Sequence, residues 1–195
     1  MKILKVDLTH LKEYTDHLKA LPEHDRISRF GFNITDYAID QLALKMAYNP
    51  NIHILWMAID SDCQIMGWGH MARDHANCWE LALSVESNHQ RKGVGDALIR
   101  EMLSWAKFNN VGEVFMHCIE SNKVIQHLAA KHKLQTRERG GGERTAALQI
   151  PEPSFFEKNA KWFKEYSELV DEMSELRLRM LNHTLGITHH TTQEK

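Results

Sequence analysis

The clearest chemical signal in the sequence is a basic, glycine-containing turn between a predicted strand and a predicted helix. The turn consists of Gln90, Arg91, Lys92, Gly93, Val94, Gly95 and Asp96. The first backbone N–H groups of a helix have no intrahelical acceptor, and the helix dipole is positive at that end. Gly93 and Gly95 let the backbone come close to an anion, and Arg91 and Lys92 add positive charge. The 90–96 turn therefore predicts a binding site for phosphate or pyrophosphate.

Two common nucleotide-binding patterns do not match this turn. A Walker loop ends in Gly-Lys followed by Ser or Thr, and the turn lacks that ending. A dinucleotide fingerprint has a third small residue three positions after Gly95, where this chain has Leu98, and its strand belongs to a βαβ unit and not to a hairpin. The alternative that stays open is a glycine turn whose basic pair is simply solvated.

A second chemical candidate is Glu80, in the predicted strand that precedes the turn. Strand alternation puts Glu80, Ala82 and Ser84 on one face. A carboxylate beside two small residues leaves room for a ligand, and it can accept the proton that an amine must lose before it attacks an acyl group. From the alternation alone, a solvated strand glutamate is the simpler interpretation.

Other reactive side chains give weaker signals. His117 and Cys118 lie on a neighbouring predicted strand, where we expect a buried structural role for Cys118. The thirteen histidines include no pair with the i, i+4 spacing of two ligands on one helix face, so we predict no metal site. Arg26 and Arg29 either bind an acidic group of a substrate or form ion pairs at the surface.

These residues need a sheet to hold them, and the hydrophobic pattern predicts one. Predicted strands span residues 3–8, 52–59, 64–72, 79–85, 111–118, 134–139 and 145–150. Predicted helices span residues 9–21, 36–48, 93–109 and 122–133. Adjacent strands joined by a short polar turn indicate antiparallel pairing. The sequence thus predicts an α/β (α+β) domain at residues 1–150, with a mixed, mostly antiparallel sheet flanked by helices.

The composition changes after Pro151 and Pro153. Apolar residues then repeat at helical spacing, which predicts a helix over residues 154–181 that is about 40 Å long. A helix of that length either crosses the domain surface or pairs with a second copy, so a homodimer through this helix is one expectation. We assign residues 151–187 as a C-terminal helical extension and residues 188–195 as a disordered tail.

The composition of the whole chain limits the class of partner. The net charge of −2 gives no reason to expect nucleic acid or an anionic membrane. Three cysteines without a CxxC pair argue against a disulfide framework, and the charged N-terminus is not typical of a signal peptide. No apolar run approaches the roughly 20 residues that span a bilayer. We therefore expect a cytoplasmic protein that binds neither membrane nor nucleic acid.

In its motifs and in the order of its predicted strands and helices, the chain resembles the GNAT superfamily of acetyl-CoA-dependent N-acetyltransferases. Residues 90–95 fit the Gln-x-x-Gly-x-Gly pyrophosphate loop of that family, and the order of elements over residues 2–150 fits its fold. Residues 25–30, Asp-Arg-Ile-Ser-Arg-Phe, resemble a motif of the bacterial branch that includes the acetyltransferase domains of protein-lysine acetyltransferases. The C-terminal helix lies outside the resemblance.

The resemblance implies roles for residues beyond the turn. Glu80 would be the general base. The cofactor would be held by the 90–96 turn and, along its pantetheine arm, by Leu83, Val85, Asn122 and Leu128. The family commonly places a general-acid Tyr where this chain has Ala129, which leaves the acid open.

The resemblance also implies a reaction. We expect an N-acetyltransferase that moves an acetyl group from acetyl-CoA to a primary amine of a small molecule or of a protein lysine. The alternative that Ala129 keeps open is a non-catalytic acyl-CoA-binding sensor. A third interpretation is a scaffold protein dominated by its terminal helix.

Overall fold

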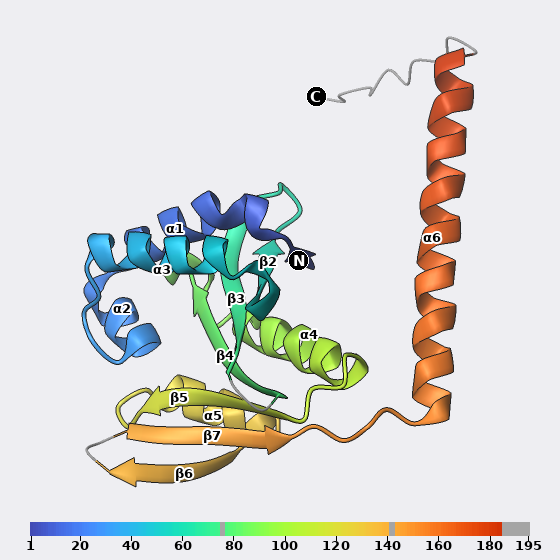
Figure 1. Cartoon of the computed structure of the whole chain (residues 1–195). Coiled ribbons are helices and arrows are strands. Elements are labelled where there is room, and N and C mark those ends of the chain that lie inside the picture. The colour runs from blue at the N-terminus through green and yellow to red at the C-terminus, as the bar shows by residue number, and fades with distance from the viewer. Residues whose placement is uncertain (75–76, 141–142, 185–195) are drawn as a thin grey trace. The chain divides into compact units, whose positions relative to one another are not determined.

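A computed structural model describes residues 1–74, 77–140 and 143–184 of the chain (Figure 1). The chain divides into two compact units, Met1–Glu152 and Pro153–Lys195. The first unit holds the sheet and the helices that cover it, and the described part of the second holds a long helix. The predicted disordered tail, residues 188–195, lies outside the described residues.

Seven strands of the described residues form one sheet, in the order β1-β2-β3-β4-β5-β7-β6. The strands are β1 (Lys2–Val6), β2 (His53–Ile59), β3 (Ile65–Arg73), β4 (Cys78–Val85), β5 (Glu113–Ile119), β6 (Gln135–Gly140) and β7 (Glu143–Gln149). Neighbours pair antiparallel, except that β4 and β5 run parallel. The predicted mixed, mostly antiparallel sheet is confirmed.

Helices lie on both faces of this sheet (Figure 1). They are α1 (Leu11–Ala20), α2 (Glu23–Phe30), α3 (Asp36–Tyr48), α4 (Val94–Phe108) and α5 (Lys123–Lys131). Four of them were predicted, and α2 was missed. Helix α2 has only Ile27 and Phe30 as apolar residues, begins after Pro22 without a side-chain cap, and ends at Gly31 with φ 82°. It therefore lacks the apolar stripe that predicts a helix.

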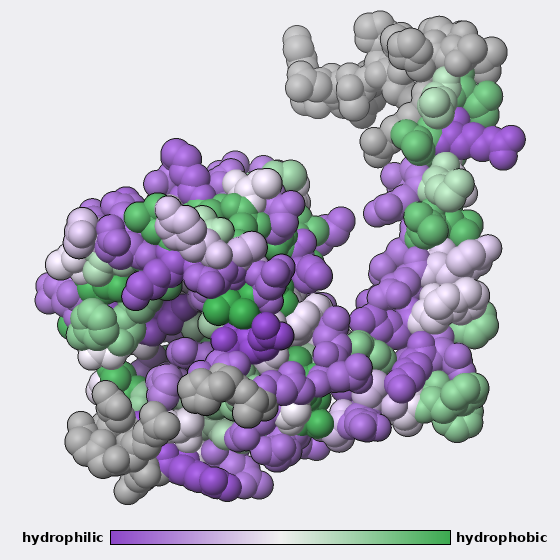
Figure 2. Space-filling view, in the orientation of Figure 1, coloured by the Kyte–Doolittle hydropathy of each residue, from purple (hydrophilic) through white to green (hydrophobic). Residues whose placement is uncertain are grey.

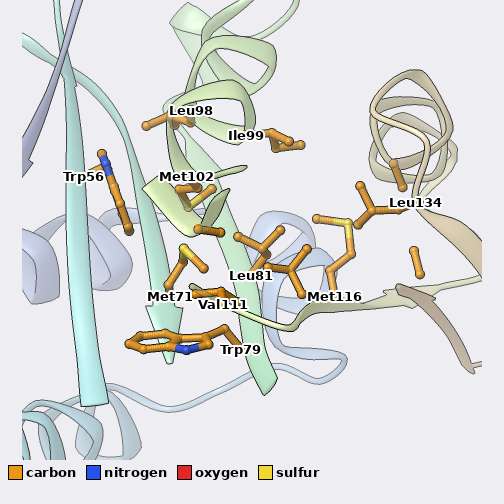
Figure 3. Packing of buried hydrophobic residues seen from close by; sticks show 14 of the residues in the cluster. Trp56, Met71, Trp79, Leu81, Leu98, Ile99, Met102, Val111, Met116 and Leu134 are labelled. Atoms are coloured by element: carbon orange, nitrogen blue, oxygen red, sulfur yellow. The ribbon is translucent and has the colours of Figure 1, made fainter. Parts of the chain in front are cut away.

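The two faces of the sheet bury separate groups of apolar side chains. Helix α4 packs on one face, where its Leu98 and Met102 belong to one apolar cluster with Met71 and Leu81 of the strands. Figure 3 shows Met102 pointing toward Met71. Helices α1 and α3 cover the other face, where Tyr14, Leu18, Ile39, Met46, Leu55 and Trp68 are buried together. Burial of these side chains is the main force that fixes both helix layers to the sheet.

Strands β4 and β5 part soon after they meet. Cys78, Trp79 and Glu80 align with residues 113–115, and β4 then continues to Val85 without further pairing to β5 among the described residues. The edge of β4 that faces β5 is thus left without a strand partner beyond Glu80. An unpartnered strand edge offers backbone N–H and C=O groups to a ligand.

Helix α6 (Phe155–Thr184) makes up the described part of the second unit. A capping box begins it: the N–H of Glu157 donates to Ser154 Oγ at 3.3 Å, and the Ser154 N–H donates to the Glu157 carboxylate at 2.8 Å. The helix has exposed apolar side chains along much of its length. None of the described helices has the length and apolar character needed to cross a membrane.

Candidate functional site

A cleft of about 740 Å³ opens where β4 and β5 part. Its walls come from β4, the start of α4, the start of α5, helix α2 and part of β5. Figure 2 shows the surface hollowed in the region below α2. The cleft therefore lies where an open edge of β4 comes next to the start of α4.

Nearly all of the predicted site residues line this cleft. They are Glu80, Leu83, Val85, Gln90, Arg91, Gly93, Val94, Gly95, Asp96, Asn122 and Leu128. Lys92 is missing from the described residues that line it, and its side chain is exposed. The fold thus brings residues from β4, α4 and α5 to one site although they are distant in sequence.

The backbone of the 90–96 turn presents the start of α4 to the cleft. Arg91 and Gly93 both have left-handed φ values, 59° and 82°, which cost a non-glycine residue steric energy. Helix α4 begins at Val94, so the N–H groups of Val94, Gly95 and Asp96 have no intrahelical acceptor. Three donors at the positive end of a helix dipole form a site for an anion.

Gly95 keeps the cleft open next to these donors. A Cβ at this position would come within 3.3 Å of Leu128 Cδ1 and 3.5 Å of Leu83 Cδ1, with Val85 Cγ2 at 3.9 Å. Three of the four residues predicted to line the pantetheine arm are therefore neighbours around one glycine. A side chain at residue 95 would fill the space between β4 and α5.

The side chain of Gln90 ties the turn to α2. Its Nε2 donates to Asp25 Oδ2 at 3.0 Å and to the Val85 carbonyl oxygen at 3.2 Å. The Ser87 hydroxyl donates to the same Asp25 carboxylate at 3.4 Å. These bonds fix the position of the turn relative to both β4 and α2, so Gln90 acts on the cleft mainly by holding its wall.

Two predicted cofactor-binding side chains have partners within the protein. Asp96 accepts hydrogen bonds from Lys131 at 2.8 Å and from His132 Nε2 at 2.9 Å, and the bond from Lys131 is the main reason that the pKa of Asp96 is lowered. Asn122 Oδ1 caps α5 by accepting from the Ile125 N–H at 3.1 Å. Asp96 can therefore offer a ligand its backbone N–H, and Asn122 can offer its side-chain NH₂ group.

The alternate residues of β4, Trp79, Leu81, Leu83 and Val85, pack in the apolar cluster with α4, which leaves Glu80, Ala82 and Ser84 on the other face, as strand alternation predicts. The Ser84 hydroxyl is 2.9 Å from His17 Nε2 of α1. Burial, and secondly the positive charge of Arg29, lowers the pKa of His17 to about 4. His17 is therefore neutral near pH 7, and it lies beside Ser84, four residues along β4 from Glu80.

The other reactive side chains considered from the sequence lie in different environments. His117 lines the cleft, whereas Cys118 is buried in the core and burial raises the pKa of its thiol to about 11. Ala129 is fully buried and is not among the described residues of the cleft, so its position supplies no acid. Within the described ranges, no three His, Cys, Asp or Glu side chains are grouped as metal ligands would be.

Helix α2 contributes cleft residues that the sequence analysis missed or left undecided. They are His24, Asp25, Ser28 and Arg29. Arg26 does not join them, because it donates to the carbonyls of residues 19, 21 and 34 and pairs with the Asp36 carboxylate at 2.8 Å. Arg29 lies in the cleft wall, and its Nη2 donates to the Tyr14 hydroxyl at 3.4 Å. The sequence signal for Asp25, Ser28 and Arg29 was the motif at residues 25–30, and His24 lies just before it.

Comparison with known protein families finds a match over the region that builds the cleft. The model of the acetyltransferase (GNAT) family matches residues 16–133, which is more than half of the chain. No curated protein matches the chain significantly. The matched residues include β4, the 90–96 turn and α5.

Solved structures share the architecture of the first unit. An acetyltransferase of the GNAT family from Staphylococcus aureus Mu50 aligns with a TM-score of 0.62 at 16% identity, covering 77% of this chain and 99% of that one. Spermidine N-acetyltransferase from Vibrio cholerae, solved with CoA and spermine, aligns at 0.59 and 14%, covering 76% and 94%. The GNAT domain of PAT from S. lividans aligns at 0.62 and 10%, covering 76% and 89%. At such identities the likeness shows a common fold.

Proposed function

The chain belongs to the acetyltransferase (GNAT) family, and from this membership we propose how its cleft works. The activity is N-acetylation, in which an acetyl group passes from acetyl-CoA to a primary amine of a small molecule or of a protein lysine. The observation that carries the proposal is that the 90–96 turn and Glu80 lie on one cleft where β4 and β5 part. The family predicted from the sequence is confirmed.

The residues present fit an acyl-CoA. The N–H groups of Val94, Gly95 and Asp96 suit the pyrophosphate, and Arg91 adds a positive charge beside them. The missing Cβ of Gly95 leaves space for the cofactor arm between β4 and α5. The unpartnered edge of β4 at Leu83 and Val85, together with Asn122 and Leu128, offers the arm backbone groups, an amide and an apolar wall.

Acetyl-CoA supplies an activated acyl group as a thioester. We assign Glu80 as the group that takes the proton from the attacking amine, directly or through a water, so that nitrogen can form a bond to the acyl carbon as the C–S bond breaks. A backbone N–H of the open β4 edge stabilises the carbonyl oxygen as it gains charge. Residue 129 is a buried alanine and supplies no acid, so the proposal takes water as the proton donor to the leaving thiolate.

Glu80→Gln tests this assignment in the full-length chain. Thiol release from acetyl-CoA is measured with a panel of amines and lysyl peptides, and CoA affinity is measured by calorimetry. The variant should lower kcat about 100- to 10,000-fold, the usual contribution of a positioned base, with little change in CoA affinity.

Glu101→Gln, which removes an exposed carboxylate from α4, is the matched control and should leave both quantities near the wild-type values. Unchanged turnover in Glu80→Gln would remove Glu80 from its role. Wild-type protein that binds acetyl-CoA but releases no thiol with any amine would favour the sensor, and protein that binds no CoA would contradict both.

The proposal includes a homodimer formed through α6. Trp162, Tyr166, Leu169, Met173 and Leu176 follow one another at spacings of four, three, four and three residues, and each is 54–63% exposed. This is the a/d spacing of a coiled coil, which buries such a seam against a second helix. In that register Glu172 falls at g and Arg177 at e. A parallel pair of helices would bring Glu172 of one copy next to Arg177 of the other.

A cytoplasmic location is also part of the proposal. The described cysteines, Cys63, Cys78 and Cys118, are all free thiols. Free cysteines suit a reducing compartment, which also holds the acyl-CoA that the reaction consumes.

A further inference from the structure

Arg29 of α2 lies in the wall of the same cleft as Glu80. We propose that its guanidinium binds a carboxylate of the amine acceptor, so that the preferred acceptors are small amino acids that carry a carboxylate near the reacting amine. The inference rests on the proposed function, because it names the substrate class of the proposed active site. Its support comes from the bonding of Arg29, from the charges around it and from the cleft that it shares with Glu80.

The two arginines of α2 differ in how they use their donors. Arg26 donates to three backbone carbonyls and to the Asp36 carboxylate, which accounts for its structural role. Arg29 has a long bond to the Tyr14 hydroxyl at 3.4 Å, and its guanidinium lies 4.8 Å from the centre of the Phe30 ring. A guanidinium has five N–H donors in a planar fork. Most of those on Arg29 therefore stay available for a ligand.

Two imidazoles near Arg29 are uncharged. Burial first, and then the positive charge of Arg29, lowers the pKa of both His17 and His70, so these imidazoles are neutral near pH 7. In the described parts of the chain, no carboxylate lies within ion-pair distance of Arg29; Asp25, one turn earlier, accepts instead from Gln90. A half-buried cation without an internal counter-ion favours binding of an anion from solution.

A carboxylate is the anion that this site suits best. The pyrophosphate of an acyl-CoA is accounted for by the start of α4, whereas Arg29 is on α2, which packs against β4. Glu80 is on β4 in the same cleft and is not ion-paired with Arg29. An amino acid places a positive ammonium and a negative carboxylate on one small molecule. Glu80 would meet the ammonium and Arg29 the carboxylate, with the two-pronged geometry that guanidinium offers.

The test compares matched acceptors in the full-length chain. The probes are L-α-amino acids and ω-amino acids of increasing length, each paired with its own carboxamide, and thiol release from acetyl-CoA gives kcat and KM. Wild-type protein should prefer the best carboxylate over its carboxamide by at least about tenfold in kcat/KM, because a charged carboxylate forms stronger hydrogen bonds with a guanidinium than a neutral carboxamide does.

Arg29→Gln should abolish that preference, mainly through a higher acceptor KM, while kcat/KM for the carboxamides and CoA affinity stay near wild type. Arg29→Lys keeps the positive charge but loses the planar guanidinium, so it should keep only part of the preference for carboxylates. If Arg29→Gln is unstable, the test uses Arg29→Lys in its place. Lys5→Gln, which removes an exposed cation from β1, is the control and should keep the full preference.

Several results would overturn the inference, each in a different way. Carboxamides that react as well as the carboxylates, or a preference that survives in Arg29→Gln, would overturn the carboxylate subsite and leave the acetyltransferase intact. A lack of turnover with carboxylates and neutral amines alike would overturn the proposed function and the inference with it. CoA affinity that falls in Arg29→Gln would assign the guanidinium to the cofactor instead.

Discussion

His17 shows how a single residue can make this fold sensitive to pH. Its side chain is only 4% exposed and its pKa is lowered to about 4, whereas an unfolded imidazole titrates near 6.5. As the pH falls from about 6.5 to about 4, the unfolded chain therefore binds a proton that the folded chain does not. The free energy of unfolding should fall over that window, by about 2 kcal/mol between about pH 7 and about pH 5 for His17 alone.

His17→Gln should reduce this loss of stability on acidification. Glutamine can still hydrogen-bond to Ser84, which lies 2.9 Å from His17 Nε2, but it cannot take up a proton. Urea unfolding at about pH 7 and at about pH 5 measures how much free energy of unfolding the wild type and the variant lose. His10→Gln, at a histidine that is 41% exposed, is the control and should lose as much as wild type. An equal loss in all three proteins would contradict a neutral His17.

At the scale of elements, the turn between β4 and α4 depends on space at Gly95. A methyl group there would come within 3.3 Å of Leu128 and would narrow the opening toward Leu83, and a larger side chain would fill it. We predict a graded loss of CoA affinity, small for Gly95→Ala and at least about tenfold for Gly95→Val, because the added atoms take the volume of the cofactor arm. Calorimetric titration with CoA measures the affinity.

Gly93→Asn is the matched control for the turn. Nothing lies within 4 Å of a Cβ at Gly93, and asparagine tolerates its φ of 82° better than other residues do. This variant should therefore keep CoA affinity closer to wild type than Gly95→Val does. Affinity that falls more in Gly93→Asn than in Gly95→Val would show that backbone conformation, and not space, limits binding.

The elements that could be predicted from the sequence are those with local signals. Helix α3 has Thr35 as its N-cap, which accepts from the Ala38 N–H at 3.2 Å, and α4 has a regular apolar face. Helix α2 could not be predicted, because tertiary bonds stabilise it: Arg26 reaches carbonyls on both sides of it, and Asp25 accepts from Gln90, 65 residues away.

The same distinction applies to the candidate site. The 90–96 turn could be predicted because its glycines, its charges and the start of a helix are adjacent in the chain. The hydrogen bonds of the Asp96 carboxylate could not be predicted, because their donors, Lys131 and His132, come from the end of α5. Arg29 also remained undecided, because its place in the cleft depends on how α2 packs against β4.

At the scale of the whole molecule, the proposed pairing of α6 with a second copy can be tested. Leu169 and Met173 lie in the middle of the predicted seam and are 54% and 63% exposed. Light scattering of the full-length chain should give the mass of a dimer. Leu169→Arg should give a monomer, because two buried charges would face each other in the seam. Ser174→Arg adds the same charge outside the seam and should leave the dimer intact.

The direction of the two helices can be tested with their charges. In a parallel pair Glu172 at g faces Arg177 at e of the partner, so Arg177→Glu would place like charges together and weaken the dimer. Exchanging both residues, in Glu172→Arg with Arg177→Glu, restores opposite charges and should restore the dimer. Sedimentation over a dilution series measures each dissociation constant. If the double exchange does not recover the affinity lost in Arg177→Glu, the helices do not pair in parallel in this register; if all variants and wild type are monomers at every concentration, α6 does not pair with a second copy.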